Sequence, residues 1–435
     1  MATLYCGPSA TGNEDGSNFS NLLALPTTTG FTRGNTYIII DGSYGSRTLS
    51  TATSGSTTIT IKKASSADSG VTGYAASLHD GEATFGEFYL TTGYWIIDGV
   101  TRTETDAWAA PAGYGIRCSS ITINGFEEYD GGGSSFSYCD IGGAWTTTPS
   151  SGTLDTYDNG TYWVAQDGPI TLSRCAIHNV TQCMMVHWSS NLTIEYCHFG
   201  PSWGKEAIAA ASGTLNDSTI RFNRFWNAGR KNNDPTSGLT AEIGAFHGGE
   251  NANVKIYGNW FYSTVTDSGR NQCILIGSAE DEVHPESPAT NCLVYNNTFA
   301  GIADDASPMI WLYGGSGNEA KNNLFYDCAS NGVTANTTAN NVTATSDPFV
   351  NYATLDLHIT SGSQAQNAGT ALASGYNSDP DGNTRGGDGT WDVGAYEYGT
   401  TGSTVSKVLG SAVSGISKFL GAAKANINKI LGTNF

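Results

Sequence analysis

The chain has 435 residues and carries 39 Asp and Glu against 20 Lys and Arg, which gives a formal charge of −19. Such a charge repels phosphate backbones, which bind basic surfaces, so the composition argues against a nucleic-acid-binding protein. Only 14% of the residues are charged and 55 are glycine, a combination that predicts a turn-rich β protein rather than a helical one.

The N-terminal segment, residues 1–34, shows no export signal. Its opening, MATLYCGPSA, has neither a basic stretch nor an apolar core, and no run of 18 apolar residues occurs anywhere in the chain. We therefore expect an N-terminal cap, no membrane span and no classical secretion. Nine cysteines without CxxC spacing favour free thiols, which indicates assembly in a reducing cytoplasm over the alternative of a disulfide set.

A repeat follows within residues 35–398. From residue 136 to 325 the same pattern recurs, at intervals of 22 to 38 residues: an apolar residue, two residues, Cys or Asn, one residue, and Ile or Phe. Such repetition predicts a solenoid whose coils stack like residues into one core. The last position runs from Ile141 to Phe325 as an inward apolar stack. The Asn column is suited to a side-chain ladder, in which Cys fills the same place as a small apolar residue; its members are Cys139, Cys175, Cys197, Asn223, Asn259, Asn297 and Asn323.

These repeats resemble the right-handed parallel β-helix proteins of the pectate-lyase-like superfamily. The opening LYCGPSATGNEDGSNFSNLLAL and the close DPDGNTRGGDGTWDVGAYEYG are similar to the two ends of many such proteins. The resemblance implies an all-β fold, a right-handed parallel β-helix over residues 35–398. It leaves the function open, because this superfamily includes lyases, hydrolases, epimerases and phage spikes.

Each coil also contains an earlier strand, and its alternation predicts two faces. We expect Met184, Val186, Ile208, Ala210, Gly244, Phe246, Ile274, Ile276, Ile310 and Leu312 to point inward. The outward set is then Cys183, Met185, His187, Ala207, Ala209, Ala211, Ile243, Ala245, His247, Cys273, Leu275, Met309, Trp311 and Tyr313. An outer face this apolar indicates a partner or a ligand groove, or else an insertion that covers it.

Candidate catalytic residues lie on this face. The alignment places His187 and His247 in one column, where two imidazoles suit proton transfer, and the alternative is a pair of packed histidines. Glu206 and Glu242 begin neighbouring strands and suit an acid pair, or else they cap backbone amides at a turn. Aromatic side chains for sugar stacking are available at Trp188, Trp203, Trp311 and Tyr313.

No metal or cofactor is required by any motif. DPDGN places Asp379, Asp381 and Asn383 at alternate positions, as at the start of a calcium loop, but Pro380 and the missing distal Glu favour a closing turn with Arg385 paired to Asp392. The prediction is therefore no cofactor, with Ca²⁺ binding left open.

The last segment, residues 399–435, has an 11-residue repeat that places Lys407, Lys418 and Lys429 in equivalent positions. It contains four lysines and no acid, so the rest of the chain is more acidic still. Three structures fit the pattern: a helical bundle joining several chains, an amphipathic anchor on an anionic surface, or short strands turning at each glycine. The repeat resembles those that end many phage structural proteins.

Two functions compete. The first is a structural virion protein of phage type, a homotrimeric spike, fibre or capsid decoration that contacts a host surface or glycans, with the lysine tail docking on other virion proteins. Such a protein is located on a virion or outside the cell after assembly in the host cytoplasm. The second is a polysaccharide-degrading lyase or glycoside hydrolase that acts through His187, His247, Glu206 and Glu242.

Overall fold

The computed structural model describes a large part of the chain. The described residues are 1–103, 113–124, 132–142, 159–164, 169–180, 182–187, 190–202, 206–210, 214–228, 243–245, 249–263, 272–279, 286–302 and 308–399. No helix among them is long and apolar enough to cross a membrane. All nine cysteines belong to this part and all are free, as the sequence predicted.

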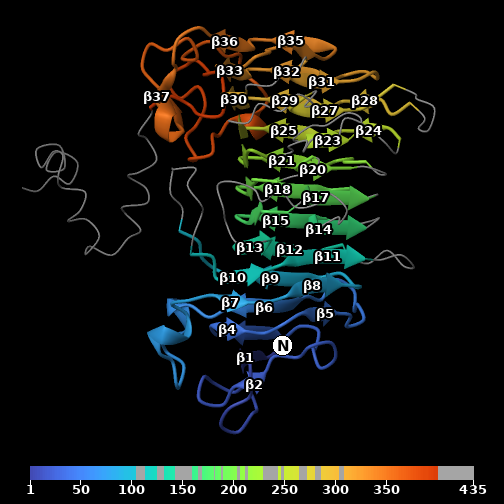
Figure 1. Cartoon of the computed structure of the whole chain (residues 1–435), viewed down its shortest axis with the longest axis vertical. Coiled ribbons are helices and arrows are strands. Elements are labelled where there is room, and N and C mark those ends of the chain that lie inside the picture. Colours follow the sequence, from blue (N-terminus) through green and yellow to red (C-terminus); the bar gives the residue numbers. More distant parts are fainter. Residues whose placement is uncertain are drawn as a thin grey trace, which may run out of the picture.

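The chain winds into a right-handed parallel β-helix, which confirms the predicted all-β fold (Figure 1). Successive coils rise from the N-terminal end, and each coil gives one strand to each of three long parallel sheets, which we name A, B and C. Parallel pairing of this kind places equivalent residues of successive coils about 4.8 Å apart along one line. The position of a residue in its coil therefore decides which residues it touches.

Sheet A has 13 strands. In spatial order they are β2 (Leu23–Ala24), β1 (Thr3–Gly7), β3 (Thr36–Ile39), β6 (Ile59–Lys63), β9 (Trp95–Asp98), β12 (Ser135–Ser137), β15 (Ile170–Ser173), β18 (Leu192–Glu195), β21 (Thr219–Arg221), β25 (Lys255–Tyr257), β29 (Leu293–Tyr295), β32 (Glu319–Lys321) and β35 (Thr337–Ala339). The N-terminal segment thus adds β1 and β2 to the sheet before the first full coil.

Sheet B has 11 strands. From the N-terminal end they are β4 (Gly42–Ser43), β7 (Ala83–Thr84), β10 (Ile116–Cys118), β13 (Cys139–Gly142), β16 (Ala176–His178), β19 (His198–Phe199), β22 (Arg224–Trp226), β26 (Trp260–Tyr262), β30 (Thr298–Ala300), β33 (Leu324–Tyr326) and β36 (Val342–Ala344).

Sheet C has 10 strands, namely β5 (Arg47–Leu49), β8 (Glu87–Leu90), β11 (Ser120–Asn124), β14 (Asn159–Val164), β17 (Gln182–His187), β20 (Ile208–Ala209), β23 (Ile243–Ala245), β27 (Ile274–Ile276), β31 (Ile310–Leu312) and β34 (Val333–Thr334). Outside the three sheets lie a parallel pair, β24 (Asn251–Ala252) with β28 (Ala289–Thr290), and an antiparallel pair, β37 (Phe349–Asn351) with β38 (Asp356–Ile359). Short 3₁₀ turns are η1 (Ser66–Asp68), η2 (Ala76–Leu78), η3 (Tyr352–Thr354) and η4 (Ser374–Tyr376).

The predicted apolar stack fills the core behind sheet B. Phe199, Phe225, Phe261, Phe299 and Phe325 lie in register on consecutive strands with their rings nearly parallel. Ring centroids are 4.7 to 5.0 Å apart. The rings therefore repeat at the strand spacing, so each coil buries the aromatic face that the previous coil leaves open.

The Asn and Cys column forms the predicted ladder at the corner between sheets A and B. Asn259 is typical: its Nδ2 donates to the Ile220 carbonyl at 2.9 Å and to Asn297 Oδ1 at 3.0 Å, and its Oδ1 accepts the backbone N–H of Asn223 at 2.9 Å. The ladder continues past the predicted repeats to Asn341, which accepts from the Asn323 amide at 2.8 Å. These bonds satisfy the buried backbone N–H groups of the corner.

A C-terminal cap, residues 345–399, follows the last coil strand and folds back along the outer face of sheet B (Figure 1, orange to red). Apolar residues of the cap, among them Leu357, Val393 and Tyr396, pack against Trp260 and Leu324 of sheet B in one buried cluster. The cap also bonds to the coils, since Ala395 N–H donates to Thr298 Oγ1 at 2.8 Å and Gly394 N–H to the Asn322 carbonyl at 2.8 Å.

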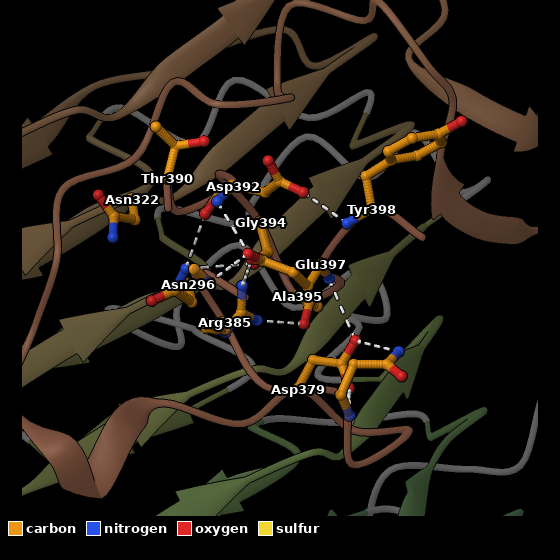
Figure 2. A network of polar contacts seen from close by, with 12 residues as sticks. Asn296, Asn322, Asp379, Arg385, Thr390, Asp392, Gly394, Ala395, Glu397 and Tyr398 are labelled. Atoms are coloured by element: carbon orange, nitrogen blue, oxygen red, sulfur yellow. Dashed lines mark hydrogen bonds and ion pairs between the residues drawn. The ribbon is translucent and has the colours of Figure 1, made fainter. Parts of the chain in front are cut away.

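Buried charges hold the cap together (Figure 2). Arg385 Nη1 lies 3.5 Å from Glu397 Oε2, so the ion pair that closes the turn joins Arg385 to Glu397. Asp379 Oδ1 accepts the backbone N–H groups of Asp381 at 3.0 Å and Asn383 at 2.7 Å, and its Oδ2 accepts that of Glu397 at 3.1 Å. The DPDGN stretch thus forms a closing turn whose aspartate binds backbone amides.

Candidate functional site

The outer face of sheet C is where the sequence placed its candidate site. Strand pairing aligns Met185, Ala209, Gly244, Leu275 and Trp311 in one row. Met184, Ile208, Ile274 and Ile310 lie in the neighbouring row and belong to the core cluster, as predicted. The face therefore exists, with Trp311 near its C-terminal end.

The predicted register of one strand is wrong. Ile243 pairs with Ile208 and Ile274, and both Ile243 and Ala245 belong to the core cluster, so Gly244 takes the outward row. The sequence had placed Gly244 inward. Both alternations bury apolar residues, and the structure selects the one that stacks isoleucine on isoleucine. The alignment of His247 with His187 was counted along this strand, but His247 lies outside the described residues, so the proposed histidine column stays a prediction.

The outer row is also less open than predicted. Met185 is 8% exposed, and Ala209 and Leu275 are each 1% exposed. Cys183, Ala207, Cys273 and Met309, which the alternation placed outside, belong to the core cluster at the start of their strands. A contiguous exposed apolar patch is therefore absent from the described part of this row. Trp311 and Tyr313 remain half-buried, with ring centroids 5.9 Å apart in an edge-to-face arrangement.

The strand heads of sheet C carry the predicted polar ladder in part. Gln182 and Glu206 stand two residues before Met184 and Ile208, and Gln182 Nε2 donates to Glu206 Oε2 at 3.1 Å. Both side chains are buried, and Gln182 Oε1 has no hydrogen-bond partner among the described residues.

The other predicted site residues cannot be placed. His187 ends β17 and its backbone pairs with Val164, but its side chain is outside the described part of the chain. The remaining predicted residues, which lie outside the described residues altogether, are Trp188, Trp203, Glu242, His247, Lys407, Lys418 and Lys429. Of the four proposed catalytic residues, Glu206 alone has a described side chain.

A polar cluster on the outer face of sheet B was missed by the sequence reasoning. Asp140 Oδ1 lies 2.5 Å from His178 Nε2, and Asp140 Oδ2 lies 3.8 Å from Arg117 Nε on the preceding strand. His178 is buried whereas Arg117 is exposed at its tip, so the cluster connects the interior to solvent. The sequence does place Asp140 and His178 beside inward residues of the repeat. The repeat pattern describes only the inward positions, so it did not indicate these two residues.

The same outer face continues to His198 and Arg224, which are neighbours on β19 and β22. Burial, together with the positive charges of Arg224 and Arg102, lowers the pKa of His198 well below its usual value. A neutral imidazole at this point can accept a proton or a hydrogen bond. Among the described residues, no three His, Cys, Asp or Glu side chains are grouped in a way that could hold a metal ion.

Comparisons with known proteins support the fold of the chain. No protein-family model matches the chain, and no curated protein matches it. Among solved structures, pectate lyase Pel9A aligns over 91% of this chain and 96% of its own, with a TM-score of 0.52 and 14% identity. The Dettilon tailspike protein (gp208) aligns over 73% of this chain and 61% of its own, with a TM-score of 0.39 and 12% identity. The PL6 family alginate lyase AlyGC covers 71% and 47% respectively, with a TM-score of 0.30 and 13% identity. The likeness to Pel9A places this chain in the parallel β-helix fold class.

Proposed function

We propose that the chain is a structural protein of phage type, a spike, fibre or capsid decoration whose β-helix contacts glycans through the outer face of sheet C. The observation that carries the glycan contact is the half-buried pair of Trp311 and Tyr313 at one end of the outward row. Aromatic rings held rigidly by a sheet offer apolar faces to sugar rings at low entropic cost.

The surroundings of Glu206 favour a structural role over glycan hydrolysis. A carboxyl group that protonates a glycosidic oxygen must reach the sugar, whereas Glu206 is 4% exposed and its carboxylate already accepts a hydrogen bond from buried Gln182. This arrangement fits the alternative that the sequence left open, in which the acids at the strand heads serve the fold.

Glycan binding is tested with a panel of purified bacterial surface polysaccharides. Trp311→Ala is expected to weaken binding about fivefold, since aromatic stacking contributes about 1 kcal/mol. Tyr89→Ala is the matched control, because Tyr89 is also a half-buried aromatic residue of sheet C and pairs with Thr48 and Thr122 far from Trp311. Equal binding by the wild-type chain and Trp311→Ala would contradict the proposed contact.

Assembly is tested by the solution mass of the full chain and of a chain that stops at Gly399. We propose that three chains associate and that the lysine repeat with Lys407, Lys418 and Lys429 either joins them or docks on the virion. A trimer that dissociates without the repeat makes the tail an assembly device, and a trimer that survives assigns the tail to docking. If the full chain and the shortened chain are both monomeric, the spike proposal loses its basis.

A second function, polysaccharide cleavage, is favoured by one observation on sheet B. Asp140 lies 2.5 Å from buried His178 and 3.8 Å from Arg117, and 13% of its side chain is exposed, so its carboxylate is placed to reach a sugar and act as a general base. If this function is correct, incubating the purified protein with the same polysaccharides produces new polysaccharide ends. Asp140→Asn would abolish this cleavage without unfolding the protein. The structural proposal expects no cleavage by either protein.

A further inference from the structure

Near the N-terminal end of the β-helix, the buried side chain of Lys63 contacts the carboxyl group of Asp41. Lys63 ends β6 in register with Ile39 of β3, and Asp41 lies between β3 and β4 on the preceding coil. The Lys63 side chain is 1% exposed, and its stem lies against Gly115, where a Cβ would stand 3.1 Å from Lys63 Cγ. The amine is therefore held in the wall of the solenoid and points to a single carboxyl group.

The two groups approach closely without forming a directed hydrogen bond. Lys63 Nζ lies 2.5 Å from Asp41 Oδ1, yet in the described part of the chain each of these atoms lacks a hydrogen-bond partner of proper geometry and is closed to solvent. Asp41 Oδ2 accepts the backbone N–H of Gly81 at 2.7 Å, which fixes the carboxyl plane. A buried ammonium carries three donors and is costly to leave unsatisfied, whereas an amide nitrogen in its place carries one donor and no charge.

A third group, Glu82, directly precedes β7, the next strand of sheet B, and directly follows Gly81, whose backbone N–H binds Asp41. Gly42 pairs with Ala83, so Asp41 and Glu82 precede paired residues on adjacent coils, and Gly42 N–H donates to the Glu82 carbonyl at 3.1 Å. Burial, followed by the charge of Asp140, raises the pKa of Glu82, and Asp41 adds to the increase while Arg117 opposes it. A raised pKa lets a carboxyl group hold its proton to higher pH, which makes it better suited to pass a proton to a departing oxygen.

We propose that Lys63 and Asp41 join in an intramolecular isopeptide bond, with Glu82 as the proton carrier. Within the ion pair a proton first passes from the Lys63 ammonium to the Asp41 carboxylate. The resulting neutral amine attacks Cγ of the carboxylic acid, a C–N bond forms, the C–OH bond breaks and one water leaves. Glu82 gives a proton to the departing oxygen and receives one from Nζ, so it ends as it began and no oxidant or cofactor is consumed. Groups held in contact react with effective molarities of about 10⁵ M or more, which offsets the low reactivity of a free acid and amine.

The test is the mass of the intact, denatured full chain. The isopeptide predicts a mass lower than that of the sequence by one water, and a digest in which the peptides containing Asp41 and Lys63 remain joined. The full sequence mass with two separate peptides would show an ion pair only and overturn the proposal.

Variants and an internal control sharpen the result. Glu82→Gln, at a half-buried position, is expected to fold and to keep the full mass, and a linked Glu82→Gln chain would overturn the role given to Glu82. Asp41→Ala and Lys63→Arg remove the two partners and are expected to keep the full mass of their sequences, with circular dichroism to confirm the fold. Lys321 and Glu319 form an ion pair of similar length, 2.6 Å, with side chains 20% and 30% exposed, and are expected to remain unlinked in the same digest.

Discussion

At the scale of single residues, the corner ladder shows how cysteine and asparagine serve one position. Cys197 Sγ approaches the Leu172 carbonyl of the preceding coil at 3.6 Å, and Asn223 Nδ2 donates to the equivalent Ile194 carbonyl at 2.9 Å. The sequence predicted cysteine as an apolar filler, but the thiol also takes the place of the amide as a weak donor. Burial raises the pKa of Cys175 and Cys197 well above the ordinary value, so these thiols are inert.

The ladder gives a graded prediction at Asn259. Asn259→Ala removes the oxygen that accepts both the backbone N–H and the Nδ2 of Asn223, which leaves two buried donors unsatisfied at about 1–3 kcal/mol each. Asn259→Cys is expected to lose less stability, because a thiol already fills this position in three earlier coils of the same column. Thermal melting of the two variants beside the wild type measures the difference, and equal losses would show that the thiol contributes packing alone.

At the scale of elements, the repeat could be predicted because every coil places the same type of residue at the equivalent position. The inward phenylalanines and the Asn column needed only a period and an apolar pattern, and the structure confirms them. The strand around Ile243 could not be predicted in the same way, since its two alternations differ by one residue and each buries apolar side chains. The inward and outward rows predicted along that strand inherited this error, whereas the placement of His187 and His247 stays a prediction.

Side-chain partners across the coils were equally inaccessible to the sequence. Asp140 and His178 are 38 residues apart, and Asp41, between β3 and β4, meets Lys63 at the end of β6 on the next coil. Their contact depends on how much chain each turn inserts, which no periodic pattern specifies. Functional residues of a solenoid are therefore harder to predict than its core.

The cap supplies a prediction of pH dependence at His358. This imidazole lies 2.5 Å from Asp356 Oδ1 through Nδ1 and 2.8 Å from Asp381 Oδ2 through Nε2, which requires a proton on each nitrogen. Burial alone would lower the pKa of His358, but the hydrogen bonds to Asp381 and Asp356 raise it to about 9.

Since the folded pKa of His358 exceeds the unfolded value of about 6.5, its contribution is fully present below that value and is lost as the pH rises through about 9. The melting temperature is thus expected to decrease as the pH rises from about 6.5 to about 9. In His358→Gln this step should disappear while the rest of the profile is kept. A variant that retains the full step would assign the pH dependence to other groups.

At the scale of the whole molecule, the two ends of the solenoid are closed by different means. At the N-terminal end Arg33 donates to backbone carbonyls of Ala52 at 3.1 Å and Gly93 at 2.8 Å, and so ties the first coils together. At the C-terminal end the cap covers apolar residues on the flank of sheet B. A stack of coils without such closures would expose pairing edges and apolar faces to other chains.

Two truncations separate the cap from the lysine repeat. A chain that stops at Gly399 keeps the cap on Trp260 and Leu324, and its melting temperature is expected to equal that of the full chain. A chain that stops at Ala344 exposes this cluster and is expected to bind a hydrophobic dye and to aggregate at temperatures where the longer chain stays monodisperse. Light scattering with dye fluorescence on heating distinguishes them. If the shorter chain melted like the longer one, the coils would be stable without the cap, and the buried Arg385 and Glu397 pair would have to serve a purpose other than closing the solenoid.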